Sequence, residues 1–171
     1  MGRPLFFDRA RAVGAYDGAL RTAIHRFKYD NRSLLAEPLG ALLAESGRQI
    51  LQRERYDIIM PVPLHERRVR QRGFNQSLFL ARQVGERWGI AIEPEGLKRS
   101  RWTDPQTMLP EKVRLKNVRG AFTYRGPGVM YKEVLLIDDV YTSGSTVNEC
   151  AKVLKKQGAG IVDVLTLART L

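Results

Sequence analysis

The sequence predicts an α/β domain built around a central, mostly parallel sheet. Short apolar runs alternate along the chain with segments of helical periodicity, which is the pattern of βα units. The apolar runs are nearly continuous, as expected for strands that are buried on both faces. A length of 171 residues suits one domain with a full core. We therefore predict a single domain over 1–171, with an N-terminal helical part over about 1–55 and a core over 56–171.

The N-terminal part begins with a short strand over 12–16. Asp17 and Gly18 then open a helix, and a second helix follows from Ser33. Because proline is tolerated only near the start of a helix, Pro38 must lie in the first turn of the second helix or kink it.

The core begins with an apolar strand over 56–62, followed by a basic loop over 64–73. Asn75 is a suitable cap for the next helix, and Phe74 with Phe79 fits a hydrophobic staple at its start.

The middle of the chain is less regular. A short strand over 90–92 precedes a polar segment, 95–118, that has no clean period. An edge strand over 121–124 and a turn at 126–128 follow.

The C-terminal part repeats the strand–helix–strand order. Buried strands over 134–137 and 161–167 flank a helix that ends at Gly158. The apolar face of this helix includes Cys150, which we interpret as a small buried hydrophobe.

Composition excludes several classes of protein. Apolar residues make up 43% of the chain and charged residues 27%, and no apolar run approaches a membrane span. The start of the chain lacks the apolar region of a signal peptide, and one cysteine cannot form an internal disulfide or a cysteine-rich zinc site. These features predict a soluble, cytoplasmic protein without a membrane span.

The net charge of +11 is concentrated in the middle third of the chain. Residues 65–126 carry 14 basic and 6 acidic side chains, whereas basic and acidic residues balance over 127–171. A local excess of positive charge suits a phosphate-bearing partner, although it can also be a solvated surface.

The most informative segment is VLLIDDVYTSGST, residues 134–146. A buried strand delivers Asp138 and Asp139 to the carboxyl edge of the sheet, where α/β folds bind ligands. Ribose hydroxyls, or a Mg²⁺ ion on a phosphorylated sugar, would satisfy such carboxylates. The following loop places hydroxyls and amides at a helix start, which suits a phosphate. This loop consists of Thr142, Ser143, Gly144, Ser145 and Thr146.

Either feature alone would favour an ordinary turn or helix cap. Both together, in this order after a buried strand, favour a ribose 5-phosphate site. The chain has no P-loop sequence, and Gly158-Ala-Gly160 follows a helix, so neither a P-loop nor a dinucleotide fingerprint is supported.

The segment 134–146 resembles the PRPP-binding motif of type I phosphoribosyltransferases. PVPLHERRVRQRGFNQS (61–77) and a downstream pattern from Arg99 to Phe122 resemble the ComF/GntX family, which groups competence proteins with amidophosphoribosyltransferase-like chains. The resemblance covers almost the whole chain from Gly14 onward. Family members commonly begin with a four-cysteine zinc module, which is absent here or lies outside this chain.

The resemblance implies a role for each matching segment. Asp138 and Asp139 would hold the ribose and be the catalytic residues, and residues 142–146 would bind the 5-phosphate. The N-terminal helices, 17–55, would form part of a hood over the acceptor. The expected pyrophosphate loop contains Pro63, Leu64, His65, Arg67 and Arg68. The expected flexible loop over 99–114 contains Arg99, Gln106 and Arg114. Mg²⁺ would arrive on the ligand, with Asp138 and Asp139 as candidates for direct contact.

Two functions follow. The first is an enzyme of the pentosyltransferase class, which transfers a phosphoribosyl group from PRPP with Mg²⁺ and releases pyrophosphate. The alternative is a non-catalytic protein of the same fold that binds single-stranded DNA during DNA uptake, or a PRPP-gated regulator. An acceptor pocket would separate the two, and no sequence motif identifies one.

Overall fold

The computed structural model describes residues 4–29, 33–51, 55–102, 117–130 and 132–170. Within them, four strands form a parallel sheet in the order β1-β6-β5-β2. Their bounds are Arg9–Ala15 for β1, Ile161–Arg169 for β6, Glu133–Tyr141 for β5 and Ile58–Pro61 for β2. The sheet is therefore all parallel, as the apolar runs predict, and its carboxyl ends meet at one edge.

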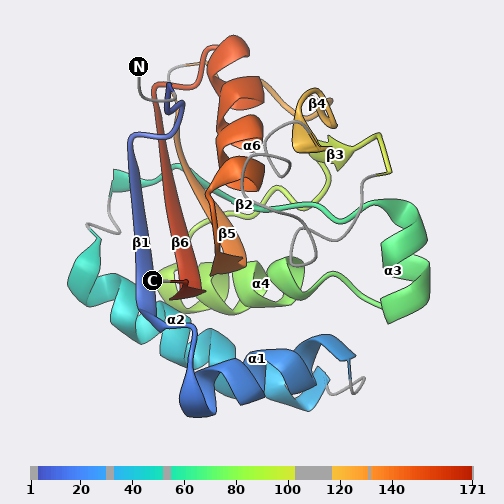
Figure 1. Ribbon diagram of the computed structural model, residues 1–171. Coiled ribbons are helices and arrows are strands. Elements are labelled where there is room, and N and C mark those ends of the chain that lie inside the picture. The colour runs from blue at the N-terminus through green and yellow to red at the C-terminus, as the bar shows by residue number, and fades with distance from the viewer. Residues whose placement is uncertain (1–3, 30–32, 52–54, 103–116, 131, 171) are drawn as a thin grey trace.

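Helices cover both faces of this sheet, and one of them crosses its carboxyl edge. Figure 1 shows α6 on one face and α1 running below the arrowheads of β5 and β6. The helices are α1 (Gly18–Tyr29), the 3₁₀ turn η1 (Ser33–Leu35), α2 (Ala36–Ile50), α3 (Glu66–Arg72), α4 (Gln76–Trp88) and α6 (Ser145–Lys156).

Successive residues along each strand point to opposite faces of the sheet. In β5, Leu136 faces a core shared with Cys150 and Leu154 of α6. Its neighbours Leu135 and Ile137 face a second core, built with α1, α2 and α4. The unbroken apolar run over 134–137 is thus explained by burial on both sides.

Several local expectations are confirmed. The Asn75 side chain accepts a hydrogen bond from the Ser77 N–H at the start of α4, and the rings of Phe74 and Phe79 lie 5.4 Å apart. Pro38 lies in the first turn of α2, and Cys150 is fully buried. No helix among the described ranges is long and apolar enough to cross a membrane.

The structure corrects other expectations. Residues 66–72 of the expected basic loop are helix α3, because His65 caps its start and Gly73 ends it with a φ of 86°. The expected strand over 90–92 is a single bridge between Ile92 and Ile59. The expected edge strand over 121–124 is β4 (Phe122–Tyr124), which pairs with β3 (Leu97–Arg99) in a separate two-stranded sheet.

Candidate functional site

The two aspartates lie inside β5, near its carboxyl end. We expected the strand to stop at Ile137, but it continues to Tyr141 because β6 pairs with it that far. Asp138 and Asp139 have different partners, Ser77 at the start of α4 and Lys28 on α1.

Asp138 faces the start of α4. Its Oδ1 accepts a hydrogen bond from the Ser77 hydroxyl at 2.9 Å and another from the Asp139 N–H at 2.9 Å. Burial, together with the negative charge of Asp139, raises the pKa of Asp138 to about 7. Asp138 can therefore change its charge near neutral pH.

Asp139 faces α1. Its Oδ2 lies 2.5 Å from the Lys28 ammonium, and both side chains are largely buried. Burial opposes the charge of Lys28, but the charge and hydrogen bond of Asp139 outweigh it and raise the pKa of Lys28 above its ordinary value. The carboxylate pair thus contains its own counter-ion.

The loop over 142–146 joins β5 to α6. Gly144 has a φ of 68° and begins α6 without a side-chain cap. A Cβ on Gly144 would lie 2.6 Å from the Tyr141 ring, so a side chain there would have to displace that ring as well as strain the backbone. The hydroxyls of Ser143 and Ser145 are 2.7 Å apart. This arrangement places hydroxyl groups and the positive end of a helix beside the aspartates, which suits an anion.

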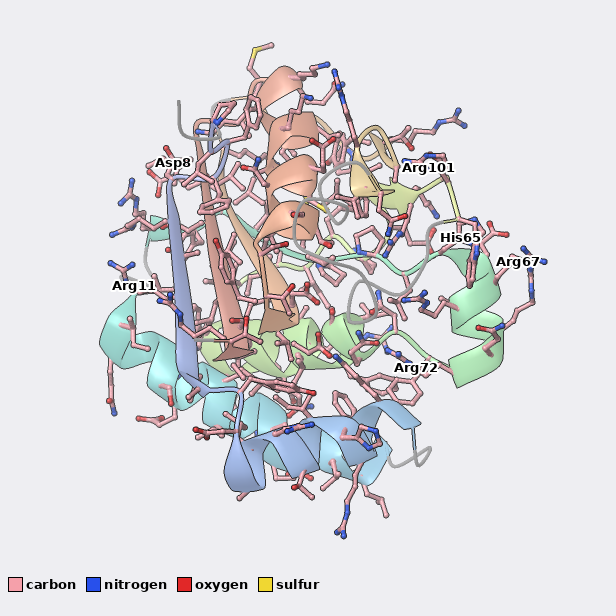
Figure 2. All side chains as sticks on the ribbon, in the orientation of Figure 1. Asp8, Arg11, His65, Arg67, Arg72 and Arg101 are labelled. Carbon is pink, nitrogen blue, oxygen red and sulfur yellow. The ribbon has the colours of Figure 1, made fainter. Side chains whose placement is uncertain are left out.

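Helix α3 carries Arg67 and Arg68, the last residues of the expected pyrophosphate loop, into a cluster around Trp102. His65 follows Pro63 and Leu64, and its ring lies 5.4 Å from that of Trp102. The guanidinium groups of Arg67 and Arg68 lie 5.4 and 5.3 Å from the Trp102 ring. We call these four side chains the Trp102 cluster. Figure 2 shows His65 and Arg67 on the same flank as Arg101 and opposite Arg11.

Arg99 belongs to strand β3, although we expected it in a flexible loop. It is buried over the ring of Phe122, with its guanidinium carbon 5.4 Å from the ring centre. Burial and the charge of Arg68 lower the pKa of Arg99, whereas Asp138 raises it. Arg99 therefore interacts electrostatically with both Arg68 of α3 and Asp138 of β5. Gln106 and Arg114 lie outside the described residues.

Sequence reasoning did not identify Lys28 or Ser77 as partners of the aspartates. Lys28 stands out only as a charged residue in an aromatic stretch of the first helix. Ser77 closes the segment 61–77 that resembles the ComF/GntX family, and this motif is the signal that could have found it.

A directly bound Mg²⁺ does not fit the two aspartates as they stand. Among the residues described, no group of three or more acidic, histidine or cysteine side chains could hold a metal ion. An ammonium already occupies the Oδ2 of Asp139, and Mg²⁺ demands near-octahedral oxygen ligands.

The comparisons with known proteins agree with this architecture. The chain is 35% identical over 172 residues to the DNA utilization protein YhgH of Escherichia coli K12, covering 99% of this chain and 75% of that protein. It is 33% identical over 168 residues to competence protein F of Haemophilus influenzae, covering 95% of this chain and 73% of that protein. No family model matches the chain.

A solved structure has the same fold. The glutamine PRPP amidotransferase of B. subtilis superimposes with a TM-score of 0.51 at 24% identity, over 77% of this chain and 25% of that chain. The sheet with helices on both faces is thus the fold of type I phosphoribosyltransferases. Together with the two relatives, it establishes that the chain belongs to the YhgH/ComF family of competence proteins.

Proposed function

We propose that this protein binds single-stranded DNA during DNA utilization and keeps a phosphoribosyltransferase-type site that binds a ribose 5-phosphate ligand such as PRPP. The names of the relatives, DNA utilization protein and competence protein, support the first part. The aspartates and the loop over 142–146 support the second.

The observation that carries the DNA-binding proposal is the Trp102 cluster. An aromatic ring flanked by guanidinium groups combines a base-stacking surface with phosphate-binding charge. Trp102 is partly exposed and Arg67 is exposed, so a strand can reach both. Such a platform stacks any base, and binding is expected to be independent of sequence.

The ligand proposal rests on hydrogen-bonding capacity at the carboxyl edge. Asp138 and Asp139 accept hydrogen bonds and suit ribose hydroxyls, and the hydroxyls of the loop suit a 5-phosphate. The buried Arg99 of β3 interacts electrostatically with Asp138 and with Arg68 of α3. A pyrophosphate bound there would use arginines that also serve the Trp102 cluster, so PRPP with Mg²⁺ is expected to compete with DNA.

Titrating a fluorescent single strand at several salt concentrations tests the DNA part. The affinity is expected to fall with salt, with a slope of about −0.7 per neutralised phosphate. Arg67→Ala with Arg68→Ala should reduce the slope, and Trp102→Ala should weaken binding by about 1–3 kcal/mol per stacked base.

Arg11→Ala with Lys156→Ala is the matched control for charge. Both residues are exposed, and they lie on β1 and at the end of α6, away from α3. If this control weakens binding as much as the α3 variant, or if no strand binds at low salt, the DNA proposal fails.

A second candidate is phosphoribosyl transfer, which the aspartate pair and the loop over 142–146 favour. The test is release of pyrophosphate from PRPP with Mg²⁺ and a panel of amines and nucleobases. Release that depends on an acceptor and on Asp138 would support a transferase, whereas PRPP binding without release would support a ligand-gated binding protein.

A further inference from the structure

We propose that Lys28 determines what the carboxylate pair can bind: as a resident counter-ion of Asp139, it excludes a directly bound divalent cation and leaves the pair suited to uncharged hydroxyls. The inference deepens the proposed ribose 5-phosphate site and rests on it for the identity of the ligand.

The first step is the position of Lys28. It lies in the last turn of α1, the helix that crosses the carboxyl edge of the sheet (Figure 1). Its side chain is 16% exposed and that of Asp139 is 6% exposed, and Nζ lies 2.5 Å from Oδ2. The ammonium thus occupies a position where a cation bound to Asp139 would have to sit.

The second step is the charge of this lysine. A buried ammonium without a partner would lose its proton, but Asp139 and, more weakly, Asp138 keep Lys28 charged. A divalent ion at the same carboxylates would meet a positive charge at close range in a partly desolvated site, where the repulsion is large.

The third step concerns the hydrogen bonds that the other carboxylate oxygens of the pair accept. Oδ1 of Asp139 accepts the Val140 N–H at 2.8 Å, and Oδ1 of Asp138 accepts two hydrogen bonds. A carboxylate oxygen can accept further hydrogen bonds from a hydroxyl without adding charge. A sugar diol therefore satisfies the pair while Lys28 stays in place, and a metal ion does not.

The test is direct Mn²⁺ binding at about pH 8, above the pKa of Asp138, monitored by electron paramagnetic resonance without any sugar phosphate. The wild type should show no site that depends on Asp139. Lys28→Met should bind Mn²⁺ at least about tenfold more tightly, because the repelling charge is gone. Adding Asp139→Asn should abolish this gain, and Lys28→Arg should behave as the wild type.

Lys155→Met is the matched control, because Lys155 lies on α6 and pairs with Asp8, outside the aspartate pair of β5, at 2.8 Å. It should gain no Mn²⁺ site. A folded Lys28→Met that binds Mn²⁺ no better than wild type would overturn the proposal. So would a wild-type site that is lost in Asp139→Asn, a measurement that needs no change at Lys28.

The role of Lys28 as a counter-ion and the binding of PRPP can be tested independently, because each can fail while the other holds. If PRPP does not stabilise the wild type but Lys28→Met gains Mn²⁺, the counter-ion assignment holds and the sugar phosphate is the wrong ligand. If PRPP stabilises the wild type and Lys28→Met gains nothing, Lys28 only anchors α1 to the sheet.

Discussion

Asp138 and Asp139 are neighbours with the same side chain, yet the structure gives them different tasks. Asp138 is held by the neutral hydroxyl of Ser77, whereas Asp139 is held by the charge of Lys28. Substitutions at the two positions should therefore separate ligand binding from stability.

Asp138→Asn should remove ligand binding and spare the fold. PRPP with Mg²⁺ should raise the melting temperature of the wild type, because a ligand at about 100 times its Kd stabilises the folded state by about 2.7 kcal/mol. The variant should lose this shift in thermal melts. An undiminished shift would show that Asp138 does not hold the ligand.

Asp139→Asn should instead destabilise the unliganded protein. It leaves the buried Lys28 ammonium without its counter-ion, which costs about 3–5 kcal/mol in comparable pairs. Urea unfolding measures the loss, and Lys28→Met with Asp139→Asn should recover part of it. If the single variant is as stable as the wild type, the ion pair contributes little.

The pKa of Asp138 also predicts how stability depends on pH. Folding raises this pKa from an ordinary 3.8 to about 7, so the folded state binds the proton more tightly than the unfolded state. Asp138 then contributes stability that is complete below about pH 4 and is lost as the pH rises through about 7. Melts across this range should show the wild type losing stability relative to Asp138→Asn. A constant difference would place the pKa near its ordinary value.

Among the elements, the loop from β5 to α6 depends strongly on a single glycine. Gly144 combines a left-handed backbone with a Cβ position that the Tyr141 ring already occupies. Its role in the fold is therefore independent of any phosphate.

Gly144→Ala should be clearly more destabilising than Gly89→Ala. Gly89, at the end of α4, has nearly the same φ of 69°, but nothing lies within 4 Å of its Cβ position. Alanine at Gly89 should cost only the left-handed strain of about 1–2 kcal/mol, and the Tyr141 clash should add to this at Gly144. Urea midpoints compare the two, and equal losses would mean that Tyr141 moves aside without cost.

For the whole molecule, the decisive feature is that two cores share the same strands. Cys150 lies in the core on the α6 side, and Trp88 lies in the core on the α2 and α4 side. Because β5 and β6 contribute residues to both cores, neither layer can lose its packing without exposing the other.

The two cores should therefore unfold together. In a Trp102→Phe background, the fluorescence of Trp88 and the reaction of the Cys150 thiol with a labelling reagent should give the same urea midpoint. Cys150 is fully buried, so early labelling would report local opening of α6. Separate midpoints would mean two independent units.

The sequence by itself determined the parallel α/β class, because the period of its apolar residues is local and survives without tertiary information. It also placed the aspartates and the loop over 142–146 at one end of a buried strand, since these residues are consecutive. The cap at Asn75 and the position of Pro38 followed from short-range rules in the same way.

Only the tertiary structure decided what surrounds those residues. The extension of β5 past Ile137 depends on pairing with β6. The short helix α3 depends on a cap by His65, and the many arginines of this segment made it look like a basic loop in the sequence. The contacts of Asp139 with Lys28 and of Trp102 with α3 join segments far apart in the chain, and the strength of the Asp139–Lys28 pair comes from burial. The order of residues along the chain gives neither the distance between two distant side chains nor the extent of their burial. The charge state of the site could therefore be determined only from the fold.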